Sequence, residues 1–209
     1  MKNPSLRREI YLLFSEAFKQ PTAEYIAEQP DIVTFLRQAF AAIDYAPPSI
    51  LYENWPELVP DLPTAAAAYR RSFLFPVLTR IVPVESVYRR WTADTSAEVP
   101  FAAEKGLLMS DHALHMKSLY DSFGITLPPE YQAMPDHICL ELEFAALLLE
   151  KKENEKHLLF IREHLDWLDE LVEDAEKKAI PDYYRQIVKL TAQFLSLELR
   201  HQRSSERIL

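Results

Sequence analysis

Residues 136–152 read DHICLELEFAALLLEKK and contain the clearest helical pattern in the chain. Asp136 precedes the apolar face as a candidate N-cap, and Lys151 and Lys152 bring positive charge to the carboxyl end, where the helix dipole favours it. The inward-facing side chains recur at the α-helical spacing: Ile138, Leu142, Ala145, Leu148 and Leu149. The stretch therefore predicts a long helix with one face in the core.

The same helical period continues on both sides of this stretch. Prolines fill two connections, 45–63 and 76–100, and forbid a continuous helix there. Together these patterns predict an all-α fold, a single helical bundle of residues 1–209 with a candidate subdomain break within 76–109. The other expected helices run from Pro4 to Pro21, from Thr22 onward, over 31–44, from a cap at Thr64 to Pro76, from a cap at Ser110 to Gly124 in the left-handed C′ position, over 158–179, and from Pro181 toward the C-terminus.

Glycine usage separates this chain from folds that contain sheets. It has two glycines, Gly106 and Gly124, and fifteen prolines. β-Sandwiches and α/β nucleotide folds need glycine in their hairpin turns and phosphate loops. Neither G-x-x-x-x-G-K-[ST] nor G-x-G-x-x-G occurs, which excludes the standard nucleotide-binding loops.

Charge and cysteine content point to a cationic partner and a reducing compartment. The formal net charge of -9 repels nucleic acid and anionic membranes and attracts basic peptides. The single cysteine, Cys139, cannot form an internal disulfide. Residues 5–11 loosely resemble a twin-arginine export signal, but the apolar run over 10–14 is shorter than an export h-region of roughly 7–15 residues. We interpret this segment as the first helix.

Candidate metal and catalytic groups are few. Cys139 and His137 stand two positions apart on the expected helix, so they should point in different directions, and core packing is expected for the thiol. A zinc site requires at least three protein ligands, and a di-iron bundle requires two Glu-x-x-His pairs. We predict no catalytic centre, no metal and no cofactor. Three pairs of residues have a spacing that would let both side chains bind one metal ion from the same helix face: His112 with His115, His137 with Glu141, and Glu198 with His201 in a polar terminal segment. The sequence pattern supplies no third ligand for any of these pairs.

An acidic run extends from Glu163 to Glu176. Such a run is usually a solvated helix face, and the alternative is a rim that attracts arginines. Twin-arginine leaders combine two arginines with an apolar segment, so their receptor needs an apolar groove bordered by carboxylates. The composition of this chain supplies both kinds of residue.

Three blocks of sequence resemble a known family. The first is Tyr69, Arg70, Phe73 and Pro76 followed by PVESVY at 83–88, and the second is PDH at 135–137 with Glu141, Leu142 and Phe144. The third is Phe160, His164, Leu165 and Trp167 followed by Tyr184, Leu190, Thr191 and Phe194. The second block is the most specific of the three. In this order they resemble the P-x-E-S-V-Y loop, the P-D-H-x-x-x-E-L-x-F signature and the closing helical pair of the TorD/DmsD/NarJ chaperones.

The resemblance implies a TorD-like helical bundle and a function in binding rather than catalysis. It implies a cytoplasmic chaperone for a molybdenum oxidoreductase subunit with a molybdopterin guanine dinucleotide site. The chaperone would bind the twin-arginine leader, the apo catalytic subunit or both, assist cofactor insertion and prevent premature export. It implies a monomer or a homodimer that exchanges helices across the 76–100 connection.

The resemblance also implies which residues border the peptide site. In relatives the loops of the first two blocks are associated with leader recognition, which selects Glu85, Ser86, Tyr88, Asp136 and His137. Asp136 could offer its carboxylate to a guanidinium or serve only as a helix cap, His137 could donate to a leader carbonyl, and Tyr88 could simply pack under its loop. Candidates completing the set are Tyr69, Trp91 and Glu141. DmsD-like members have tryptophan in place of Tyr88, so the client enzyme stays open.

Two other functions stay open at this point. One is a metal-dependent helical hydrolase or oxidase built on His112, His115, His137 and Glu141. The other is an acidic helical interaction protein with a different client, such as a partner of a transcriptional regulator.

Overall fold

The computed structural model describes residues 3–52, 55–74 and 80–206. The regular elements in these ranges are helices, and the ranges contain no β-strand, only an isolated antiparallel bridge between Val84 and His137. The predicted all-α class is confirmed. The helices are α1 Pro4–Ala17, α2 Ala23–Ala27, α3 Gln29–Ala42, η1 Ser49–Leu51, α4 Trp55–Leu58, α5 Leu62–Phe73, α6 Glu85–Tyr88, α7 Asp111–Ser122, η2 Pro129–Tyr131, α8 Ile138–Glu150, α9 Asn154–His164, α10 Leu168–Lys177 and α11 Asp182–Glu206.

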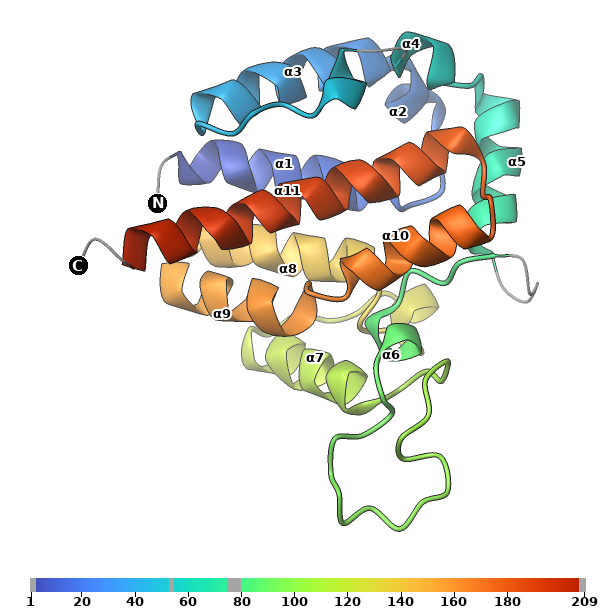
Figure 1. Ribbon diagram of the computed structural model, residues 1–209, viewed down its shortest axis with the longest axis vertical. Coiled ribbons are helices and arrows are strands. Elements are labelled where there is room, and N and C mark those ends of the chain that lie inside the picture. Colours follow the sequence, from blue (N-terminus) through green and yellow to red (C-terminus); the bar gives the residue numbers. More distant parts are fainter. Residues whose placement is uncertain (1–2, 53–54, 75–79, 207–209) are drawn as a thin grey trace.

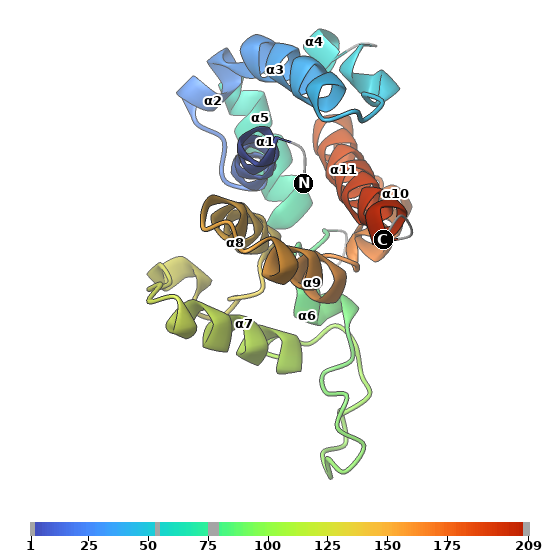
Figure 2. The same ribbon diagram turned by 90° about the vertical axis from the view of Figure 1, so that its left-hand side faces the viewer.

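The helices stack in layers around α1, α8 and α11 (Figure 1). Helix α1 packs against α8, α3 and α11, and α11 also contacts α5, α9 and α10. Helix α7 lies on the side of α8 and α9 away from α1, and the 89–110 segment extends beyond it (Figure 2). One hydrophobic cluster includes residues of α1, α3, α5, α7, α8, α9, α10 and α11. The proposed extent of the domain, 1–209, remains a prediction.

Several predicted helix ends are confirmed. Pro4 is the first residue of α1, Thr22 caps α2 through the Tyr25 amide, and Gly124 follows α7 with φ +68°. The predicted stop at Pro76 lies outside the described residues. Among those residues, no helix is both long enough and apolar enough to span a bilayer.

Three predicted helix ends are wrong. Helix α5 begins at Leu62, because the carboxylate of Asp61, not Thr64, caps it by accepting the Thr64 amide at 2.9 Å. Helix α8 is capped by His137 rather than Asp136. Residues 158–179 belong to two helices, because the Trp167 indole donates to the carbonyl of His164 at 2.9 Å and the chain turns between α9 and α10.

The terminal helix contributes a buried ion pair to the core, which corrects the expectation that Glu198 lies in a polar segment. Glu198 and Arg7 are both buried and pair with each other. The Tyr45 hydroxyl donates to Glu198 Oε1 at 2.8 Å, and Arg7 donates to the same hydroxyl oxygen at 2.8 Å. These contacts join α11 to α1 and to the connection after α3.

Candidate functional site

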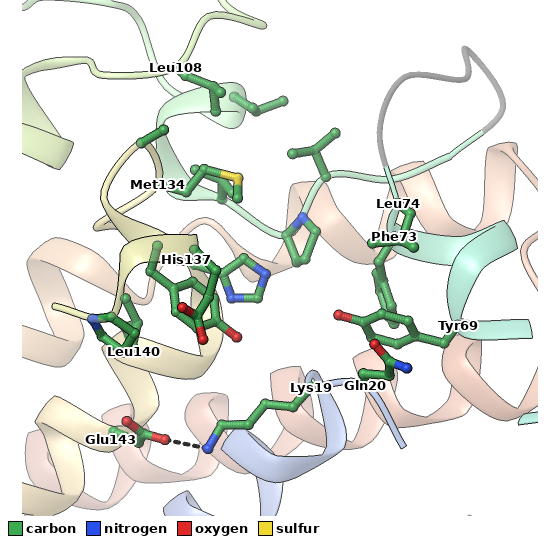
Figure 3. A pocket seen from close by; sticks show the side chains of 18 of the residues that line it. Lys19, Gln20, Tyr69, Phe73, Leu74, Leu108, Met134, His137, Leu140 and Glu143 are labelled. Atoms are coloured by element: carbon green, nitrogen blue, oxygen red, sulfur yellow. Dashed lines mark ion pairs between the residues drawn. The ribbon is translucent and has the colours of Figure 1, made fainter. Parts of the chain in front are cut away.

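A groove with a volume of about 960 Å³ lies where six segments meet (Figure 3). Its walls come from the ends of α1 and α5, from 82–87, from the end of the 89–110 segment, from 128–137 and from the start of α8. Residues distant in sequence therefore build one surface. The apolar lining residues include Tyr69, Phe73, Leu74, Val82, Pro83, Val84, Val87, Leu108, Pro128, Tyr131, Ala133, Met134 and Leu140.

Three carboxylates also line this groove: Glu16, Glu130 and Glu143. Lys19 lies among them and pairs with Glu143 at 2.7 Å and with Glu16 at 3.1 Å, the first of which is drawn in Figure 3. Burial alone would lower the pKa of Lys19, but the bonds and charges of the two glutamates more than offset it and the pKa is raised. The groove thus combines an apolar surface with a mainly acidic edge.

Two loops in the groove wall are joined by backbone hydrogen bonds. The Glu85 amide donates to the carbonyl of Asp136 at 3.0 Å, and the Ile138 amide donates to the carbonyl of Pro83 at 2.9 Å. These bonds form the bridge between Val84 and His137, and both of these residues line the groove. The two loops, 83–88 and 135–138, therefore form one structural unit.

Hydrogen bonds to the Asp136 carboxylate, in the protein interior, stabilise this pair of loops. The carboxylate is fully buried and accepts the Ser86 amide at 2.7 Å and also the Ser86 hydroxyl. Ser86 Oγ in turn lies 2.8 Å from Ser110 Oγ at the start of α7. Burial raises the pKa of Asp136, and the bonds from Ser86 offset this only in part. In this arrangement Asp136 and Ser86 position the loops and do not face the groove.

His137 and Tyr69 do line the groove. Nδ1 of His137 accepts the Cys139 amide at 3.3 Å, and burial lowers the pKa of the ring to about 3. The neutral ring then carries its hydrogen on Nε2, which makes that nitrogen a donor. Tyr69 is half-buried and contacts Phe73 with ring centroids 5.4 Å apart.

The expectation that His137 and Cys139 point in different directions is wrong. His137 precedes the helix instead of belonging to it, and its Nδ1 lies 3.0 Å from the sulfur of Cys139. The thiol is nevertheless buried, as predicted, and burial raises its pKa to about 12. Such a thiol is protonated at neutral pH and is a poor nucleophile.

The sequence profile of the nitrate reductase delta subunit family matches residues 51–182, more than half of the chain. The chain belongs to the nitrate reductase delta subunit family. No curated protein matches it in sequence. Among solved structures it is similar to a protein from Archaeoglobus fulgidus described as a candidate redox enzyme maturation protein. The identity is 20%, the TM-score is 0.56, and the match covers 90% of this chain and 93% of that one. This likeness shows a shared fold.

The side chains of Glu85 and Glu141 are fully buried. Burial would raise the pKa of Glu85, but hydrogen bonds from His112 and His164 outweigh it and the pKa is lowered. The pKa of Glu141 is raised well above its usual value by burial and then by the charges of Glu85 and Asp136. The Trp167 indole donates to Glu141 at 3.2 Å. Both glutamates therefore lie behind the groove wall.

Tyr88 and Trp91 do not line the groove. The Tyr88 ring stacks on Trp167, with centroids 5.2 Å apart, and its hydroxyl donates to Asp174 at 3.0 Å. Trp91 packs against Phe101 with centroids 4.9 Å apart. Tyr88 thus packs under its loop, one of the two alternatives that the sequence left open.

Several carboxylates of the acidic run from Glu163 to Glu176 form ion pairs with basic side chains of the same chain. Arg89 pairs with Asp166, Lys105 pairs with Glu170 at 3.1 Å, and Lys189 pairs with Glu176. The groove draws its carboxylates from other parts of the chain. Sequence reasoning missed Glu16, Lys19, Glu130 and Glu143, because no spacing rule connects residues around the end of α1 with residues of η2 and α8.

Proposed function

We propose that this chain is a cytoplasmic maturation chaperone that binds the twin-arginine leader of a molybdenum oxidoreductase subunit in the groove. Family membership supports a function in enzyme assembly, and the fold is similar to that of a candidate redox enzyme maturation protein. The observation that carries the proposal is an apolar groove of about 960 Å³ edged by three carboxylates. A leader has the complementary chemistry, since its apolar segment can bury against the groove and its arginines can pair with carboxylates.

The eight predicted site residues then divide into two groups. His137 and Tyr69 contact the leader, with Nε2–H of His137 donating to a leader carbonyl. The others position the groove from behind or beside it: Glu85, Ser86, Tyr88, Trp91, Asp136 and Glu141. The leader arginines pair with Glu130, Glu143 or Glu16, which lie at the groove.

The client is held by its leader until its cofactor is loaded, which delays export. The apo catalytic subunit can add a second contact. The groove is formed by a single copy of the chain, so a monomer suffices for leader binding, whether or not helices are exchanged across 76–100 in a dimer.

Titration calorimetry with twin-arginine leader peptides tests this proposal. We expect 1:1 binding that weakens when both arginines become lysines, because lysine cannot make the bidentate bond of a guanidinium to a carboxylate. It should also weaken when the apolar segment of the peptide is replaced by serines. Equal affinity for all three peptides, or no binding at all, would contradict the proposal.

A pair of chain variants locates the binding surface. Leu108 lines the groove and is 39% exposed, whereas Leu159 is 53% exposed on α9 and does not line it. Both can therefore become lysine at little cost to the core. Leu108→Lys removes an apolar contact and repels the leader arginines, so it should weaken leader binding at least about tenfold, which corresponds to about 1.4 kcal/mol. Leu159→Lys should leave the affinity unchanged.

A further inference from the structure

Three of the six histidines gather at a second site, separate from the groove. His112 and His115 lie on α7, and His164 is the last residue of α9. They line a cavity of about 420 Å³, which also reaches Arg89, Arg162, Glu163 and Asp166. Helices α6, α7 and α9 meet in this part of the molecule (Figure 2).

Two imidazole nitrogens converge on one buried carboxylate. Nδ1 of His112 lies 3.0 Å from Glu85 Oε1, and Nδ1 of His164 lies 2.8 Å from Glu85 Oε2. One ligand atom from each of these three residues fits within a span of 4.8 Å. A zinc ion bound at about 2.0–2.2 Å by nitrogen and carboxylate oxygen in a tetrahedral site places its ligand atoms roughly 3.3–3.6 Å apart. These separations fit within that span and are a few tenths of an ångström longer than the two histidine–carboxylate distances.

We propose that Glu85, His112 and His164 bind a divalent transition-metal ion of the zinc type. Imidazole and carboxylate ligands suit zinc, and three protein ligands leave a fourth position open. The cavity over His112 supplies room for a water molecule or an anion there. The sequence pattern had given His112 and His115 no further ligand; the structure adds Glu85 and His164, which come from segments remote in the chain.

The surroundings include a histidine that orients one of the ligands. Nε2 of His164 lies 2.8 Å from Nδ1 of His115. When Nδ1 of His164 binds the metal, its Nε2–H donates to His115, which is the hydrogen bond that metal-binding histidines usually make with their second nitrogen.

The positive charges of two arginines disfavour the binding of a cation at this site. Nε of Arg89 lies 3.6 Å from Glu85 Oε1, and its guanidinium pairs with Asp166. Arg162 lines the cavity. Replacing Arg89 by alanine should therefore tighten metal binding. A bound metal would join α6, α7 and α9, and it would stabilise the 83–88 loop that forms part of the groove wall.

Zinc titration of the full, untagged, metal-free chain tests the site, with Co²⁺ absorption as a second probe. We expect one Zn²⁺ per chain and an intense tetrahedral Co²⁺ spectrum. His112→Ala should weaken binding by roughly 100-fold or more, and His115→Ala by roughly 10-fold, as loss of an outer partner does. His112 is one-third exposed, so its replacement should leave the fold intact, which circular dichroism checks.

Ser118→Ala is the matched control, because Ser118 is exposed on the same helix as His112 and lies outside this cluster. It should bind Zn²⁺ as the unaltered chain does. The inference is overturned if the unaltered chain takes up no Zn²⁺, or if His112→Ala binds it equally well. Neither result depends on whether the chain binds a leader peptide.

Discussion

Replacing Asp136 by alanine tests whether this residue positions the groove or contacts the leader. The side chain is fully buried and accepts two hydrogen bonds from Ser86, one from the amide and one from the hydroxyl. Alanine leaves both donors without this acceptor. The prediction is therefore that Asp136→Ala lowers the stability of the folded chain.

The magnitude follows from these two bonds. A buried donor left without an acceptor costs about 1–3 kcal/mol. The Ser86 hydroxyl keeps Ser110 as a partner at 2.8 Å, so the larger cost falls on the Ser86 amide. We expect a total of about 3 kcal/mol, which lowers the melting temperature by roughly 6–12 °C in a chain of this size.

Asp136→Asn is the matched variant. Asparagine has the same shape and one carbonyl oxygen, which can still accept the Ser86 amide. Burial raises the pKa of Asp136, so the neutral amide also avoids the cost of a buried negative charge. We expect Asp136→Asn to cost no more than about 1 kcal/mol.

Urea unfolding and leader titration at low temperature give the two readouts. The folded Asp136→Ala chain should keep its leader affinity within about tenfold, since the carboxylate does not reach the groove. An unchanged unfolding curve combined with complete loss of leader binding would refute this reasoning. That result would mean that the aspartate contacts the leader directly.

Three further predictions concern other parts of the chain. Burial lowers the pKa of His157 to about 3, well below its unfolded value near 6.5. The stability that the neutral ring provides above pH 6.5 is therefore lost as the pH falls. Urea unfolding should show that His157→Phe removes roughly 2 kcal/mol of the stability lost between pH 7 and pH 5. Glu198→Ala should destabilise the chain by about 3–5 kcal/mol in urea unfolding, because it removes the carboxylate that forms an ion pair with the buried guanidinium of Arg7. Lys19→Ala should tighten leader binding roughly threefold in low-salt calorimetry by releasing Glu143, and the gain should shrink at about 0.5 M salt.

Helix positions were the most predictable part of the structure. The apolar period, the prolines and Gly124 were sufficient to locate α1, α3, α7, α8 and α11. The break inside 158–179 was not visible, because the period continues across it. It depends on the Trp167 indole, which donates to the His164 carbonyl and so requires knowledge of side-chain placement.

The candidate site was predictable only through its motifs. The sequence singled out the loops that form the groove wall, and the structure joins them through the Val84–His137 bridge. A pattern does not distinguish a carboxylate that faces a guanidinium from one that binds a neighbouring loop, and Asp136 does the latter. The groove edge was missed because Lys19 and Glu143 meet only after α1 has packed on α8.

The most direct test of the account is photo-crosslinking of a twin-arginine leader peptide that carries a photoreactive residue in its apolar segment. Mass spectrometry should locate adducts on the groove residues Leu108, Met134 and Leu140. Adducts confined to other exposed apolar side chains, such as Leu114 and Leu159, would contradict the claim that this groove receives the leader.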